Sequence, residues 1–584
     1  MSKYYRVAFL LLLTSALLIP VWSFLTEPYI VRPSPLKLFE TIHPTYYVGL
    51  AALALSLVIL AAKTRSTFHS TLNPYLVTAL FLTLYIQLPA TLLFEHPIND
   101  HTYQLTPVFY ILREGNINMT NYPHPETVTP QLFASIFIMT TSISSPLENL
   151  NRISVFLLPL LTTLSIYIFM RRFGVSERFT MMFSVLNMGL IYFPFMFLRQ
   201  TYTMPLYIML GLLIFIALKE RNPSFSVLAI ITSVAFVMSD PAHVILTIIP
   251  LALFTVAWFA IRSTSLTSKG EEKHFRSPCI FVSLLSIMFL FWIISSSPRM
   301  IIDLWSIATR MWDIFIKSIT ELTYPILESP IYWGVPTALV FNDYYASLYR
   351  VSISLKALSI ALPTTLLAYL LLNKKTRSMI LRPETLFLVS YFFITGIVII
   401  TRGYGVTYTP WATMITLYAL NRLNDAKQFT FKVHRAFTLS SLCLLLALII
   451  AAIIVAPHII YSGGRIRLPT ADIHAIFWAS SHSSQVFMIS PSVGSWLSDV
   501  VYSEGGYHIT IGDYLFYEGL TYESIDKLAQ YKMVIIPRSV LMHFEKTEAC
   551  YIAPEMLKLL ADKLSNDHNL VYNSGYPFIT IWLK

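Results

Sequence analysis

The chain has 584 residues, of which only 12% are charged while 55% are hydrophobic. Soluble domains carry about 25% charged residues, so this composition excludes an ordinary soluble enzyme and a disordered chain and predicts a multi-pass membrane protein. Residues 458–584 hold 9 basic and 12 acidic side chains, a net charge of −3. The rest of the chain therefore carries +13, and the whole chain +10. We attribute this basic excess to membrane topology and expect no nucleic-acid partner, since no basic face is interleaved with aromatic residues.

Apolar runs suited to a bilayer core of about 30 Å recur along the first three quarters of the chain. The first follows Lys3 and Arg6, and no small-residue cleavage site comes after it, so we interpret it as an uncleaved first transmembrane helix and not as a signal peptide. The sequence predicts about 13 transmembrane helices, at 7–25, 46–62, 74–94, 153–170, 177–198, 204–218, 224–239, 243–261, 279–297, 351–372, 384–400, 404–420 and 437–457.

Lysine and arginine are concentrated in alternate loops between these runs, and positive charge favours the cytoplasmic side. The basic loops are 63–65, 171–172, 219–221, 262–276, 374–375 and 422–435. The N-terminus is therefore expected inside, the long loops 95–152 and 298–350 outside, and the C-terminus outside. We expect a polytopic helical domain over 1–457 in the cell membrane.

The first long loop carries polar groups just where a helix leaves the bilayer. Its segments FEHPINDH (94–101) and NYPHPE (121–126) include Glu95, Asp100, His101, His124 and Glu126. A carboxylate near low dielectric is costly unless it binds a cation or accepts a proton, so Asp100 is the leading catalytic candidate. Solvation or helix capping explains such carboxylates equally well. The apolar run 131–145 is too short to span and is expected in the membrane interface.

The second long loop contains an amphipathic pattern over 300–324, with charged residues three, four and seven apart opposite an apolar side. This pattern predicts a helix lying flat in the headgroup layer, for which a purely structural role is the simpler interpretation. The segment 325–349 that follows is open to two interpretations, an ordered cap and a flap over a site.

Four more polar residues lie at the predicted outer ends of helices: Arg199, Asp240, His243 and Arg402. Arginine offers paired donors to a phosphate, whereas a single arginine at a helix end is more simply an anchor that reaches the interface. All four belong to the same predicted side of the membrane, which favours a shared substrate-binding role.

Residues 458–584 alternate short β-type runs (486–490, 533–537 and 578–583) with helix-like stretches (522–530 and 554–565). This alternation predicts a small external α/β domain. No nucleotide-binding glycine loop or zinc spacing occurs in the sequence, which disfavours an ATP-driven pump.

The layout and motifs resemble the C-type glycosyltransferase superfamily, particularly its archaeal members. The resemblance rests on Asp100-His101, Gly115 and the segment 122–125 (YPHP), supported by the segment 240–243 (DPAH). It implies an integral-membrane enzyme that takes a sugar from a polyprenyl-phosphate carrier and transfers it to a glycan, lipid or protein. Asp100 would act as base or as ligand of a divalent metal such as Mg²⁺ or Mn²⁺, with Glu95 or Glu126 as a second acid. Arg199 and Arg402 would bind the carrier phosphate.

Two departures narrow this resemblance. No Asp-x-Asp or Asp-Glu pair occurs at Asp100, so a metal is not assigned, and the Trp-Trp-Asp-Tyr-Gly motif of oligosaccharyltransferases is absent from the C-terminal region. Two other functions stay open, a transporter or lipid flippase and a non-enzymatic envelope scaffold. Convergence of the external polar groups on one region would favour the enzyme.

Overall fold

The fold is described from a computed structural model. The described residues are 3–25, 43–63, 74–92, 96–97, 107–108, 111–112, 115, 128–141, 160–175, 180, 199–220, 222–263, 277–296, 305, 309, 316, 361–372, 382–402, 405–425, 467–468, 476, 478–489, 509–512, 530–536, 562–566, 569–573 and 580–583.

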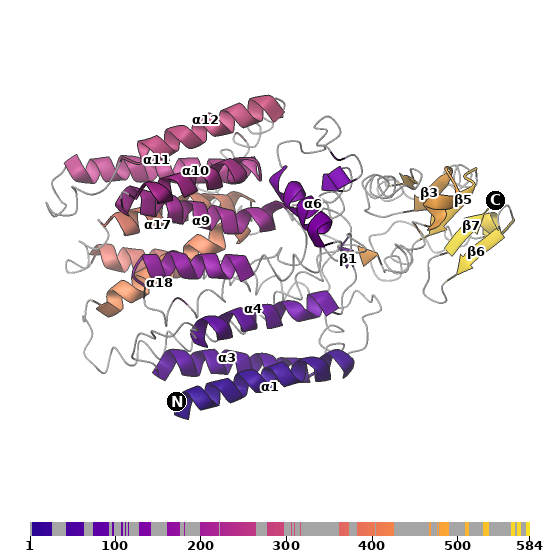
Figure 1. Ribbon diagram of the computed structural model, residues 1–584, viewed down its shortest axis with the longest axis horizontal. Helices are drawn as coiled ribbons and strands as arrows, with labels where there is room; N and C mark the ends of the chain where they lie inside the picture. Colours follow the sequence, from indigo (N-terminus) through magenta and orange to yellow (C-terminus); the bar gives the residue numbers. More distant parts are fainter. Residues whose placement is uncertain are drawn as a thin grey trace.

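Long apolar helices make up most of the described chain (Figure 1). They are α1 (Lys3–Leu25), α3 (Thr45–Lys63), α4 (Pro74–Leu92), α6 (Thr129–Thr141), α9 (Arg199–Glu220), α10 (Pro223–Val237), α11 (Pro241–Ser263), α12 (Cys279–Ser296), α17 (Pro383–Arg402) and α18 (Gly405–Asp425). Residues 160–172 and 361–372 are helical as well. Among the described residues, four helices, in α1, α9, α11 and α12, are long and apolar enough to cross a membrane.

The described residues of the predicted spans are helical apart from 238–239, which follow α10. Residues 437–457, 153–159, 351–360 and all but one residue of 177–198 lie outside the described residues, as do a few residues at the ends of other spans. Helices are the expected solution for apolar runs, because a backbone in hydrocarbon must satisfy its own hydrogen bonds. The total of about 13 transmembrane helices stays a prediction. So does the flat helix over 300–324, of which residues 305, 309 and 316 are described and helical.

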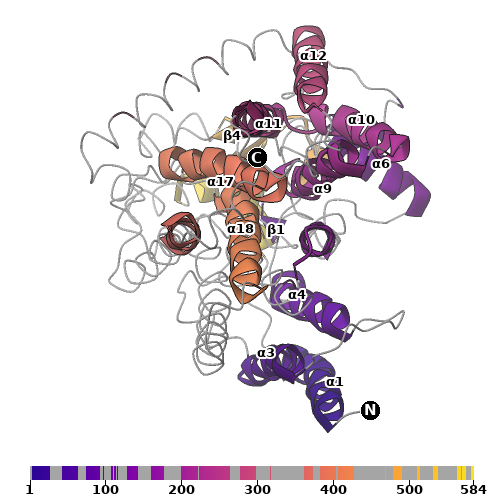
Figure 2. The same ribbon diagram turned by 90° about the vertical axis from the view of Figure 1, so that its left-hand side faces the viewer.

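Helices α9, α17 and α18 lie between two outer groups of helices (Figures 1 and 2). Helices α1, α3 and α4 gather at one side of the bundle and α10, α11 and α12 at the other, in both views (Figures 1 and 2). Ser15 Oγ donates to Gly49 O at 2.8 Å and Ser56 Oγ to Ala8 O at 2.9 Å, which joins α1 to α3. These hydroxyls give the antiparallel pair α1–α3 a polar contact that apolar side chains alone cannot supply.

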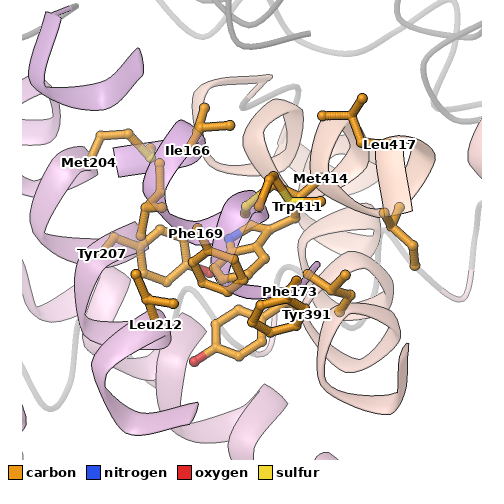
Figure 3. Packing of buried hydrophobic residues seen from close by; sticks show 14 of the residues in the cluster. Ile166, Phe169, Phe173, Met204, Tyr207, Leu212, Tyr391, Trp411, Met414 and Leu417 are labelled. Carbon is orange, nitrogen blue, oxygen red and sulfur yellow. The ribbon is translucent and has the colours of Figure 1, made fainter. Parts of the chain in front are cut away.

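An aromatic core lies where α9, α17 and α18 meet the helical residues 160–172 (Figure 3). The Trp411 ring stacks on Tyr391 with 4.0 Å between ring centroids, and it meets the edges of Phe169 and Tyr207 at 5.7 and 5.5 Å. Such pairs contribute about 0.5–1.5 kcal/mol each beyond their burial. The core therefore fixes how α9, α17 and α18 are placed, and with them the helix ends described below.

The C-terminal residues form a five-stranded mixed sheet in the order β4-β3-β5-β7-β6. Its strands are β3 (Val486–Ile489), β4 (Ile509–Gly512), β5 (Met533–Ile536), β6 (Asn569–Asn573) and β7 (Thr580–Leu583). Strands β4, β3 and β5 are parallel, and β7 pairs antiparallel with β5 and β6. The three β-type runs expected from the sequence are β3, β5 and β7.

A second, two-stranded sheet connects distant parts of the sequence. Strand β1 (His96–Pro97) pairs antiparallel with β2 (Arg467–Leu468). Figure 1 shows this pair between the helix bundle and the five-stranded sheet.

Candidate functional site

Arg199 begins α9 and Arg402 ends α17, and the packing of these helices places both residues at one end of the bundle. Lys219 Nζ lies 2.7 Å from Glu384 Oε1, the Phe215 and Phe387 rings are 5.2 Å apart, and Tyr207 and Tyr391 are 6.0 Å apart. As the residue number rises along α9 it falls along α17, so the helices are antiparallel neighbours. Their lengths of 22 and 20 residues are nearly equal, so the backbones of Arg199 and Arg402 come level. The side chains of both arginines lie outside the described residues.

Asp240 and His243 form a buried pair at the start of α11. Asp240 Oδ2 lies 2.9 Å from His243 Nδ1, and Asp240 Oδ1 accepts a hydrogen bond from Ala242 N at 3.1 Å. The two side chains are 4% and 6% exposed. Since Pro241 is the first residue of α11, Asp240 has the position and the contact of an N-cap. Capping accounts for Oδ1 and the bond to the His243 ring for Oδ2.

Tyr207 marks how deep this pair lies. Its ring meets the His243 ring edge-on at 5.6 Å, and its hydroxyl donates to Leu246 O at 3.0 Å. Tyr207 is eight residues from Arg199, or about 12 Å along the axis of α9 at 1.5 Å per residue. The Asp240–His243 pair is thus packed about two helical turns inward from the level of the arginines. Sequence reasoning did not find Tyr207, because a single aromatic residue within an apolar run carries no distinguishing signal.

Helix α6 lies against the same end of the bundle. Thr129 N donates to Met238 O, just after α10, at 3.1 Å, and the Phe133 ring meets Tyr202 of α9 edge-on at 5.6 Å. At 13 residues, α6 is about 20 Å long, too short to span a bilayer. Phe133, Ile136 and Met139 are exposed, as expected of a helix that presents one apolar side to the membrane interface.

The acidic loop is the part of the first long loop over residues 94–126, of which the structure describes 96–97, 107–108, 111–112 and 115. Asp100, Glu95, His101, His124 and Glu126 all lie outside the described residues, although β1 begins directly after Glu95. Gly115 has φ of +68°, and its N–H donates to Ile111 O at 2.9 Å. Only glycine adopts this left-handed conformation without steric cost, which explains why the motif has glycine at position 115.

Within the described part of the chain, no group of three or more His, Cys, Asp or Glu residues is placed to hold a metal ion. Asp240 and His243 form a group of two and are occupied with each other.

No family model matches this chain, and no curated protein matches it. Among solved structures it is similar to ArnT from Cupriavidus metallidurans bound to undecaprenyl phosphate, with 10% identity over 87% of this chain and 97% of that chain and a TM-score of 0.44. The apo state of the same ArnT gives 11% identity, the same coverage and the same TM-score. This likeness is loose, and we derive the function from the residues of this chain.

Proposed function

We propose that the chain is a glycosyltransferase of the cell membrane that moves a sugar from a polyprenyl-phosphate carrier to an acceptor on the outer face. The observation that carries the proposal is the common level of Arg199 and Arg402, set by the antiparallel packing of α9 and α17. The C-terminal end of α4 is at the same end of the bundle as α6 in Figure 1, and the acidic loop follows α4 in the sequence. In this proposal the loop carboxylates and the two arginines meet at that end.

Each part has a role in the proposed reaction. Apolar helices hold the lipid tail, and Arg199 and Arg402 bind the carrier phosphate through charge-assisted hydrogen bonds. Asp100 takes the proton from the acceptor hydroxyl, whose oxygen then attacks the sugar carbon bonded to the phosphate. The bond between that carbon and the phosphate oxygen breaks, and the two arginines stabilise the charge left on the phosphate.

The remaining candidates have supporting roles in this proposal. Glu95 or Glu126 serves as the second acid, and His101 and His124 contact the sugar or the acceptor. If Mg²⁺ or Mn²⁺ is used, Asp100 would be one of its ligands, and the metal would supply positive charge beside the phosphate. The Asp240–His243 pair holds the turn between α10 and α11. Residues 458–584 form an external domain in this proposal.

A transporter or flippase is the runner-up. Transport sites normally place ionisable side chains near the bilayer midplane. In the described helices the ion pairs Lys219–Glu384 and Arg172–Glu220 lie at helix ends, whereas the Asp240–His243 pair is packed inward. The carboxylate of that inward pair is already bonded to Ala242 N and to the His243 ring, which favours chemistry at the membrane surface over passage of an ion or substrate through the bundle.

The test is release of sugar from a radiolabelled polyprenyl-phosphate hexose by the full chain in lipid. Asp100→Asn keeps the shape of the side chain and removes its charge, and loss of a general base typically lowers the rate about 10²–10⁴-fold. Asp425→Asn, at the end of α18, is the matched control and should keep wild-type turnover. EDTA sensitivity would establish a metal.

Arg199→Gln and Arg402→Gln should each raise the KM for the carrier and also lower kcat, because they remove both phosphate binding and the stabilisation of the charge left on the phosphate. Wild-type turnover in Asp100→Asn would remove Asp100 from the mechanism. Absence of turnover with a panel of carriers would reject the glycosyltransferase and leave transport or scaffolding.

A further inference from the structure

The strand pair β1–β2 joins the start of the acidic loop to the C-terminal region. His96 lies opposite Leu468 and Pro97 opposite Arg467 in an antiparallel register. The two strands are more than 300 residues apart in sequence, and each is only two residues long. Strands this short have little stability of their own, so the pair depends on the described elements nearest to it in the sequence.

Both strands are tied closely to described elements. Three residues separate the end of α4 at Leu92 from β1, and three residues reach about 10 Å at most. Strand β2 precedes Ile476 and Ala479, which are buried, and then β3 of the five-stranded sheet. Through this pair, the backbone just after α4 is hydrogen-bonded to the backbone that leads into the C-terminal sheet.

The residue types suit this pairing. Pro97 has no N–H, so it cannot take part in a position where opposite residues exchange two hydrogen bonds. Antiparallel pairs alternate between exchanging and non-exchanging positions, which leaves His96 and Leu468 to exchange the bonds. Proline is tolerated in strands only where its missing donor is not needed, and the register gives Pro97 such a place.

Chain length alone ties the candidate acids to this pair. Glu95 directly precedes β1, and Asp100 follows Pro97 by three residues, so Asp100 is no more than about 11 Å from the strand along the chain. We propose that β2 is a positioning strand: Arg467 and Leu468 fix the start of the acidic loop against the C-terminal region and so align Asp100. The effect on turnover rests on the proposed glycosyltransferase function, whereas the contact itself does not.

Cysteine cross-linking tests the contact without any enzyme assay. Pro97→Cys with Arg467→Cys occupies a non-exchanging position, where Cα atoms are about 4.5 Å apart, within the range of a disulfide. The full chain in lipid, with Cys279, Cys443 and Cys550 replaced by serine, should form this disulfide at least 10-fold faster than the matched pair His96→Cys with Arg467→Cys. In the matched pair the two side chains point to opposite faces of the ribbon. Equal rates would overturn the inference.

Positioning is tested by removing one donor. Leu468→Pro deletes the N–H that pairs with His96 and Leu468→Ala retains it. We expect Asp100→Cys to react with a maleimide at least threefold faster or slower when combined with Leu468→Pro than with Leu468→Ala. In the sugar-release assay, Leu468→Pro should lower kcat at least 10-fold relative to Leu468→Ala. An unchanged labelling rate would overturn the positioning role even if the carrier proves to be wrong, and a changed rate without any turnover would keep it and reject only the proposed reaction.

Discussion

Asp240 connects four groups at the turn between α10 and α11. Its carboxylate binds Ala242 N and the His243 ring, and its carbonyl accepts from the backbone N–H groups of His243 and Val244 at 3.1 and 3.3 Å. A carboxylate accepts hydrogen bonds only, so His243 Nδ1 donates to it. A buried charge is tolerated when it is hydrogen-bonded in this way. The turn is thus held by the side chain and the backbone carbonyl of one residue.

Removing this carboxylate should destabilise the protein. Asp240→Ala loses the helix cap, at about 0.5–2 kcal/mol, and leaves the His243 ring nitrogen buried without its acceptor, at about 1–3 kcal/mol. Asp240→Asn keeps an oxygen for Ala242 N and should cost about 1 kcal/mol. Thermal unfolding in detergent would rank wild type above Asn above Ala, and an alanine variant as stable as wild type would contradict the capping role.

At the scale of helices, α3 and α4 are in close contact at Gly49. A Cβ atom at this position would overlap Tyr85 Oη and lie 2.8 Å from Tyr85 Cζ. The Tyr85 ring cannot move away freely, because it stacks on Tyr46 at 5.2 Å and its hydroxyl donates to Tyr46 O at 3.2 Å. Glycine at position 49 is therefore required by the packing of these two helices.

Gly49→Ala should lower stability by about 1–3 kcal/mol through overpacking. Tyr85→Phe alone removes one hydrogen bond and should cost about 1 kcal/mol. Combined with Gly49→Ala it also removes the overlapping oxygen, so the double variant should be more stable than the sum of the two single effects predicts. Unfolding temperatures of the three variants measure this coupling, and strict additivity would show that Tyr85 Oη is not the obstacle.

The ion pair between Lys219 and Glu384 joins the C-terminal end of α9 to the N-terminal end of α17. The atoms are 2.7 Å apart, and the side chains are 50% and 12% exposed. Exposed pairs contribute about 0.2–1 kcal/mol, so a double-mutant cycle with Lys219→Met and Glu384→Gln should give a coupling in that range that weakens as salt is added. Arg172 and Glu220, 3.7 Å apart and more exposed, are the matched comparison and should couple less. A coupling independent of salt would contradict this assignment.

How far these elements could be predicted depends on how local their cause is. Apolar runs form helices for a reason contained in each run, and the predicted spans that the structure describes are helical. Strands β4 (Ile509–Gly512) and β6 (Asn569–Asn573) were missed because each has only two or three apolar residues next to glycine or asparagine, a run too short to distinguish from a loop without its neighbouring strand. The pairing of β1 with β2 and the contact of Tyr207 with His243 join distant residues, so no local pattern indicates them. The residues of the acidic loop stay predictions.

At the scale of the whole molecule, the antiparallel helices give the bundle two unlike ends. One end holds Lys219, Glu384, Arg172 and Glu220, and the other holds the backbones of Arg199 and Arg402 and, in Figure 1, adjoins the C-terminal sheet. Basic loops favour the cytoplasm, and Lys219 and Arg172 belong to such loops. The end next to the sheet is therefore expected to face outward.

Labelling with a membrane-impermeant maleimide tests this orientation. Cys279 is exposed at the start of α12 and follows the basic loop 262–276, so it should stay unlabelled in intact cells. A cysteine at the exposed position Ser481, ahead of β3, should be labelled in a variant with Cys443→Ser and Cys550→Ser. Both should react once the membrane is permeabilised, which shows that each thiol is accessible. The reverse pattern would place Asp100, Arg199 and Arg402 on the cytoplasmic side, and the proposed acceptor would then have to be a cytoplasmic one.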